Sequence, residues 1–205
     1  RLLINEEPTP FITYKVGIAG RQDQLSYLDD FYEAGVKIFE ISLSLDNLWT
    51  APGTLDFQLV DNAINQYLFA APEGKLLIAL NIYAPKWWLT AHPEEATHYG
   101  QEAIPQVAYS SEIFRDESTL MLRKLLEYLE SKTCSNRIIG YFLVGGDDGQ
   151  WMQWVKGGTG AMASVADKRL SDYSKPMQAY FHKRLKKKYR TIGKLNRAWQ
   201  QHHNS

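Results

Sequence analysis

The sequence lacks several features that mark particular classes of protein. Its single cysteine, Cys134, excludes an internal disulfide. Its formal net charge is zero at pH 7, so no overall field would attract nucleic acid or an anionic membrane surface. A basic run at 183–190 falls in a helical pattern, and we interpret it as a solvated helix face. No apolar run approaches the roughly 20 residues of a membrane span. We therefore expect neither nucleic acid nor a membrane as partner.

Motifs for metals and common cofactors are also missing. No G-x-G-x-x-G follows the first expected strand, which weakens a dinucleotide-binding interpretation. The chain begins with Arg1 and shows no signal peptide, so its start looks trimmed or processed. The histidines form no recognised ligand spacing; they are His92, His98, His182, His202 and His203. We expect no metal and no cofactor.

Strand-like and helix-like patterns alternate four times along the chain. The expected strands cover 11–16, 36–43, 75–82 and 137–144. The expected helices cover 23–34, 57–69, about 111–132, 174–189 and 191–199, and a long loop is expected over 83–109. This alternation predicts an α/β fold, with parallel strands joined by crossover helices. Two architectures fit it: an open doubly wound sheet, or about four units of a TIM (β/α)8-type barrel, in a single domain over 1–205.

Polar and aromatic residues follow the expected strands at the ends where parallel α/β folds bind ligands. The second strand is followed by Asp46, Asn47 and Trp49. The third is followed by Asn81, Tyr83, Trp87 and Trp88, and the fourth by Asp147, Asp148, Gln150, Trp151 and Trp154. Tryptophan beside carboxylates and amides suits a sugar, whose ring has an apolar face and whose hydroxyls hydrogen-bond. The alternative is that these tryptophans pack helices onto the rim of the barrel.

One acidic residue lies inside a strand. Glu40 is flanked by Phe39 and Ile41 in the second expected strand. It either points into the barrel as a group of the site or turns to a polar partner within the structure. Both alternatives remain open from the sequence.

An ordered set of motifs resembles a known group of enzymes. The stretches are PKWWLTAHPEE, NRIIGYFLVGGDDGQWMQW, DYSKPMQAYFHKRLKKKY and LNRAW. In this order they resemble bacterial clan A glycoside hydrolases related to the family 42 β-galactosidases. The resemblance implies a retaining (β/α)8 barrel, with an acid/base glutamate just beyond strand four and a nucleophile glutamate at strand seven. It also favours a secreted or periplasmic location.

The sequence departs from that group in two ways. Gln150 stands where the group has glutamate before tryptophan, and an amide cannot supply the proton, although it can bind sugar. Asp148 is the remaining candidate for the acid. The chain also stops after four expected strands, before the strand that would carry the nucleophile. A half barrel leaves two open edges. We therefore expect a fragment, or a chain that pairs with itself or with a second segment to close the barrel.

Three hypotheses about function follow. The first is a glycoside hydrolase domain for β-linked galactose-like sugars, truncated or inactive as it stands. Its stacking and hydroxyl-binding residues would be Asn81, Trp87, Trp88, Asp147, Asp148, Gln150, Trp151, Trp154 and Glu40. The second is a carbohydrate-binding pseudoenzyme with the same cleft and no proton donor. The third is a doubly wound module that binds a small anionic ligand or a protein partner.

Overall fold

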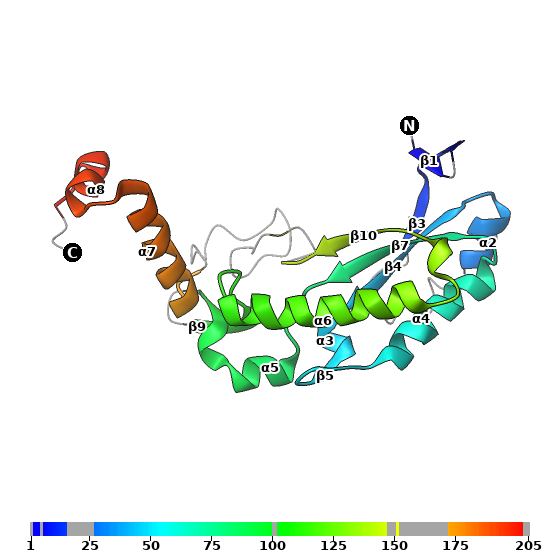
Figure 1. Ribbon diagram of the computed structural model, residues 1–205, viewed down its shortest axis with the longest axis horizontal. Coiled ribbons are helices and arrows are strands. Elements are labelled where there is room, and N and C mark those ends of the chain that lie inside the picture. Colours follow the sequence, from blue (N-terminus) through cyan, green and yellow to red (C-terminus); the bar gives the residue numbers. More distant parts are fainter. Residues whose placement is uncertain are drawn as a thin grey trace. The chain divides into compact units, whose positions relative to one another are not determined.

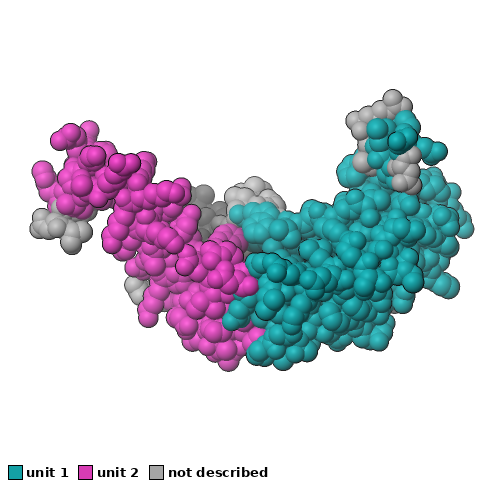
Figure 2. All heavy atoms as spheres, viewed as in Figure 1, with its two compact units in different colours: residues 1–85, 117–152 teal, residues 86–116, 153–205 magenta. Residues whose placement is uncertain are grey.

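The computed structural model describes residues 2–4, 6–15, 27–99, 102–146, 151 and 172–202. The chain divides into two compact units (Figure 2). Unit 1 comprises 1–85 and 117–152, and unit 2 comprises 86–116 and 153–205.

A four-stranded parallel sheet forms the centre of unit 1. Its strands are β3 (Thr13–Lys15), β4 (Ile38–Ser44), β7 (Lys75–Asn81) and β10 (Ile138–Val144), and their spatial order is β10-β7-β4-β3. Each new strand therefore joins the edge left by the strand before it. A doubly wound sheet would reverse its order at a switch point, whereas a barrel grows in this sequential way. The doubly wound alternative is wrong.

Helices cover one face of this sheet (Figure 1). They are α2 (Leu28–Glu33), α4 (Phe57–Ala70) and α6 (Glu112–Ser131), the last of which begins in unit 2. The ring of Tyr14 on β3 stacks on Phe31 of α2, with centroids 4.1 Å apart. On β10, the hydroxyl of Tyr141 donates to Glu130 of α6 over 2.5 Å. Alternate strand positions therefore face the helices.

The core lies between the sheet and these helices. Strand β4 contributes Phe39 and Ile41, and β7 contributes Ile78 and Leu80, all at most 1% exposed. The helices add Val60, Ile64, Met121, Leu125 and Leu129, also at most 1% exposed. The start of α4 is fixed by Asp56, whose carboxylate accepts from the backbone N–H groups of Gln58 and Leu59. The buried stripes of α4 and α6 thus agree with the helical periodicity that predicts these two helices.

Short elements flank the sheet in unit 1. The first two strands, β1 (Leu2–Ile4) and β2 (Glu7–Thr9), form an antiparallel hairpin. Between β4 and α4 lie α3 (Leu45–Leu48), β5 (Trp49–Ala51) and β6 (Thr54–Leu55), and η2 (Ser135–Arg137) precedes β10.

Most of the segment expected to be a long loop lies in unit 2. That expectation is wrong, because 83–109 holds α5 (Lys86–Ala91), η1 (Pro93–Glu95) and the hairpin of β8 (Ala96–Tyr99) and β9 (Glu102–Val107). The unit also contains α7 (Lys175–Tyr189) and α8 (Ile192–Trp199). Among the helices that the structure describes, none is both long and apolar enough to cross a membrane.

Candidate functional site

The face of the sheet opposite the helices carries the polar side chains of the strands. On β4 these positions are Glu40, Ser42 and Ser44. Their partners in register on β7 are Leu77, Ala79 and Asn81. On β10, Phe142 is in register with Ala79 and Val144 is in register with Asn81. Residues paired in register point to the same face, so these side chains form rows that run across the strands. In a closed barrel this face is the interior.

Glu40 has a partner on the neighbouring strand. Its Oε1 lies 2.7 Å from Nζ of Lys15, and the two residues are in register between β3 and β4. The glutamate is 8% exposed, so the ammonium neutralises a charge that the strand almost completely buries. The two alternatives left open by the sequence therefore do not exclude one another. Glu40 lies on the inner face, and it is also held by a polar structural partner. A sugar contact of Glu40 stays a prediction.

The carboxyl ends of β4, β7 and β10 meet in one row. Asn81 ends β7, is half-buried, and is level with Ser44 and Val144. The next residue, Ile82, donates its backbone N–H to the carbonyl of Val144 over 2.8 Å. The hydroxyl of Tyr83 then donates to the carbonyl of Gly146 over 3.0 Å. These bonds hold the loops after β7 and β10 together, so Asn81 stands on a fixed edge.

A local hydrogen bond stabilises the loop after β4. The hydroxyl of Ser44 hydrogen-bonds the carboxylate of Asp46, which is exposed in the first turn of α3. Trp49, expected among the sugar-facing residues after this strand, is only 2% exposed. It packs inside the structure, as the alternative interpretation proposed.

Trp151 folds back over the end of β10. Its backbone N–H donates to Gly145 O over 2.7 Å, and its indole Nε1 donates to Leu143 O over 3.0 Å. The ring lies so close to Gly145 that a Cβ at that position would be 3.1 Å from it. The backbone of Trp151 has φ +57°, a left-handed conformation that costs a non-glycine residue free energy. The side chain remains 52% exposed, so a partly accessible indole stands at the carboxyl end of β10.

The two tryptophans after β7 lie in unit 2. Trp88 is fully buried, with its ring centroid 4.4 Å from that of His92 and 5.0 Å from that of Phe114 in an edge-on arrangement. This corrects the prediction that Trp88 stacks on sugar, because its faces are occupied by protein. Trp87 is half-buried on α5. Its role toward sugar stays a prediction.

The remaining predicted site residues follow β10 in the sequence. Asp147, Asp148, Gln150 and Trp154 lie outside the described residues, so their roles also stay predictions. Within the described part of the chain, no cluster of three or more His, Cys, Asp or Glu side chains is arranged to hold a metal ion.

Asp172 has a structural role that was not predicted from the sequence. Its Oδ1 accepts from the backbone N–H groups of His98, over 2.9 Å, and Ser174, over 2.8 Å, while its Oδ2 accepts from the hydroxyl of Ser174. Ser174 in turn caps α7 by accepting from Met177 N. The Asp-Tyr-Ser motif therefore joins β8 to the start of α7. Its signal in the sequence was a pair of capping residues just before Pro176.

Comparisons with known proteins agree with this geometry at the level of fold. No protein-family model matches the sequence, and no curated protein matches it. Among solved structures, a β-galactosidase from Bacillus circulans sp. alkalophilus matches 92% of this chain and 25% of its own, with 15% identity and a TM-score of 0.63. A β-galactosidase from the haloarchaeon Halorubrum lacusprofundi matches 95% and 28%, with 15% identity and a TM-score of 0.62. The catalytic domain of a β-amylase from Paenibacillus polymyxa matches 94% and 50%, with 12% identity and a TM-score of 0.70.

The sequence identity to these proteins is low, whereas the structural similarity is substantial. The chain spans only about a quarter of the length of the two β-galactosidases and half of the β-amylase domain. The matched structures are TIM-barrel glycoside hydrolases. The sequential parallel sheet with helices on one face is what such a barrel contains. The prediction of a partial (β/α)8-type barrel is confirmed: this chain has the fold of the TIM-barrel glycoside hydrolases over the part of their length that it matches.

Proposed function

We propose that the chain forms part of the sugar-binding cleft of a glycoside hydrolase barrel that acts, with retention, on β-linked galactose-like sugars. The observation that carries this proposal is Trp151. Its half-exposed indole is held by two hydrogen bonds at the carboxyl end of β10. Active sites of such barrels lie at this end of the strands.

The chemistry of this edge suits a pyranose. An indole face covers the apolar C–H face of a sugar ring, while an amide can both donate to and accept from hydroxyl groups. Asn81 supplies such an amide at the end of β7, on the same edge of the sheet. Because Tyr83 and Ile82 hold the β7 and β10 loops together, little conformational entropy would be lost when a sugar binds there.

Hydrolysis needs more than this part of the chain provides. A retaining glycosidase of the common type uses two carboxyl groups about 5 Å apart. Among the described carboxylates near this face, Glu40 is paired with Lys15 and Asp46 bonds Ser44. Position 150, where the resemblance expects the acid/base, carries an amide. We therefore propose that the 205-residue chain binds sugar and does not hydrolyse it.

A complete active site would require further strands. In the described sheet β3 and β10 are the two edges. We propose that the barrel is closed by strands of a longer protein or by a second copy of the chain. The second candidate function is a carbohydrate-binding pseudoenzyme, and the one observation that favours it is Gln150. An amide at the acid/base position would leave the site without a proton donor even in a closed barrel.

The test combines binding with hydrolysis. Lactose would be titrated into the chain while tryptophan fluorescence is followed, and aryl β-glycosides would be assayed with the chain and with Gln150→Glu. Binding that is lost in Trp151→Ala and kept in Trp199→Ala, a second half-exposed tryptophan, would support the cleft. Lactose binding that is unchanged in Trp151→Ala would refute it. Activity gained only with Gln150→Glu would support position 150 as the acid/base and would contradict the proposal that the active site needs further strands.

A further inference from the structure

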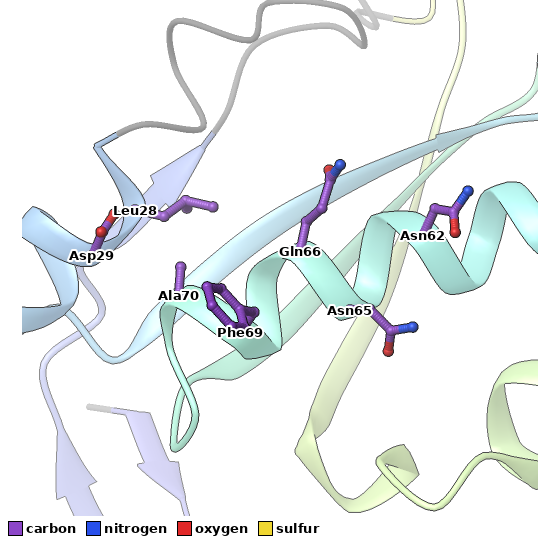
Figure 3. A pocket seen from close by; sticks show the side chains of 7 residues that line it. All are labelled: Leu28, Asp29, Asn62, Asn65, Gln66, Phe69 and Ala70. Carbon is purple, nitrogen blue, oxygen red and sulfur yellow. The ribbon is translucent and has the colours of Figure 1, made fainter.

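A hollow lies in unit 1, on the helix side of the sheet. It is widely open, has a volume of about 710 Å³, and is bounded by the first residues of α2 and by residues 62–70 of α4 (Figure 3). Its lining includes Leu28 and Asp29 of α2. The face that carries Glu40 and Asn81 is on the opposite side of the sheet. The cavity is therefore separate from the strand-end cleft.

Amide side chains dominate its α4 wall. Asn62, Gln66 and Phe69 are spaced at i, i+4 and i+7, so they share one face of the helix, with Asn65 beside them. Figure 3 shows Asn62 and Gln66 projecting to the same side of α4. The side-chain oxygen of Asn62 accepts from Nε2 of Gln58 over 3.0 Å, which orients the amide and leaves its two N–H donors available.

An aromatic ring stands beside these amides. Phe69 is 90% exposed, more than any other large hydrophobic residue in the described part of the chain. Single exposed hydrophobic residues are common on protein surfaces. This one, however, borders a cavity with amides on one wall and a carboxylate, Asp29, on the other. A flat apolar face next to several donors and acceptors is the combination that a sugar ring requires.

The charged residues of the cavity lining indicate which class of ligand the cavity can bind. Among the described residues that line the cavity there is no lysine or arginine, so this lining offers no cation to a phosphate, a sulfate or a nucleotide. Asp29 would repel an anionic ligand and would accept hydrogen bonds from hydroxyl groups. The volume falls within the range of small-molecule sites, about 300–1,000 Å³. We propose that this cavity is an accessory site for a neutral saccharide, with a ring stacked on Phe69 and hydroxyl groups bound by Asp29, Asn62 and Gln66.

This inference rests on the proposed function only for its choice of ligand. An accessory site on the helix side would hold a polymeric or oligomeric sugar to the protein while another part occupies the strand-end cleft. Local concentration of the substrate would rise through this second attachment. The site itself needs no catalytic residue.

The test is an NMR titration of the 15N-labelled full chain with lactose. We expect lactose to shift the backbone amide signals of residues 62–70 and of Asp29. Phe69→Ala should weaken the affinity obtained from these shifts at least fivefold. The matched control is Leu59→Ala, which removes another exposed hydrophobic residue from α4 outside the cavity and should leave the affinity unchanged.

The same spectra separate the two sites. If lactose shifts residues 143–146 and 81–83 but not 62–70, the accessory site is refuted while the proposed cleft stands. Shifts at 62–70 that persist in Trp151→Ala and disappear in Phe69→Ala establish the accessory site whatever happens at the strand ends. If no signal moves at saturating lactose, or if Phe69→Ala and Leu59→Ala behave alike, the inference fails.

Discussion

Lys15 and Glu40 join the first two strands of the sheet by an ion pair of 2.7 Å, in addition to their backbone ladder. The pair is asymmetric, because the lysine side chain is 54% exposed and that of the glutamate 11%. The lysine loses little hydration by pairing, whereas the glutamate depends on its partner for compensation.

Replacing Lys15 alone should therefore lower the free energy of unfolding more than replacing both Lys15 and Glu40. Lys15→Met leaves an almost buried carboxylate without a counter-charge and should lower the free energy of unfolding by about 1–3 kcal/mol. The double variant Lys15→Met/Glu40→Gln should recover most of that loss. Urea unfolding of both variants measures the difference, and equal losses would show that solvent already compensates Glu40.

Asp61, Tyr128 and Lys132 link α4 to the end of α6. Lys132 Nζ lies 2.7 Å from Asp61 Oδ1, and the hydroxyl of Tyr128 donates to Oδ2 over 2.8 Å. Hydrogen bonds from Lys132 and then Tyr128 lower the pKa of Asp61 below its ordinary 3.8. The hydrogen bond to Asp61 raises the pKa of Lys132 above its ordinary 10.5. The cluster therefore stabilises the fold fully between these two ordinary values.

The pH dependence of Asp61→Asn follows from these directions. At pH 7 the variant should melt a few degrees below the parent. Since the folded pKa of Asp61 is depressed, its contribution disappears as pH falls through that pKa, so the two melting curves should converge below pH 3.8. Thermal melts from pH 2 to 8 measure this. Glu127→Gln, an exposed change on α6, is the control, and a gap that stays constant down to pH 2 would contradict the assignment.

Trp88 should behave as a core residue. Trp88→Ala removes a fully buried side chain between His92 and Phe114, and we expect a loss of about 3–5 kcal/mol. Trp88→Phe should cost less, because an aromatic ring remains against Phe114. Chemical unfolding followed by circular dichroism gives both values, with Trp151→Ala as the exposed control. A Trp88→Ala chain as stable as its parent would return Trp88 to the candidates for sugar binding.

Asp172 should hold the amino end of α7 in place. Asp172→Ala removes the acceptor for the backbone N–H groups of His98 and Ser174, at a cost of about 1–2 kcal/mol. Hydrogen exchange of residues 174–178 should speed up in this variant. Tyr173→Phe, at an exposed neighbour, should leave the exchange unchanged. Faster exchange in both would point to a general loosening and away from the Asp172 contacts.

The long apolar runs of the sequence predicted the sheet well. The expected strands 36–43, 75–82 and 137–144 differ from β4, β7 and β10 by at most two residues at either end. Strands buried in a parallel sheet need continuous hydrophobic runs, and few other structures produce them. The hairpin of β8 and β9 was missed because its strands are short and β9 contains Pro105, which argues against a central strand. A two-stranded ribbon has only edges, so it tolerates the proline.

The residues of the candidate site were harder to predict from the sequence than the strands. Trp49, Trp88 and Trp151 all follow expected strands, yet two are buried and one is half-exposed. What separates them is tertiary packing against residues such as Phe114, which lies 26 positions beyond Trp88. The left-handed backbone of Trp151 also has no signature in its residue type. Side-chain identity located the edge of the sheet but not which tryptophan remains exposed.

The strand order β10-β7-β4-β3 also bears on how the chain folds. Each strand of this sheet after β3 pairs with the sheet strand that precedes it in the sequence, so the sheet does not require its first and last strands to meet. The sheet can grow unit by unit as the chain leaves the ribosome, with each helix closing over the strands already in place. In the described sheet β10 is an edge strand, and an edge strand presents backbone N–H and C=O groups that can pair with a further strand.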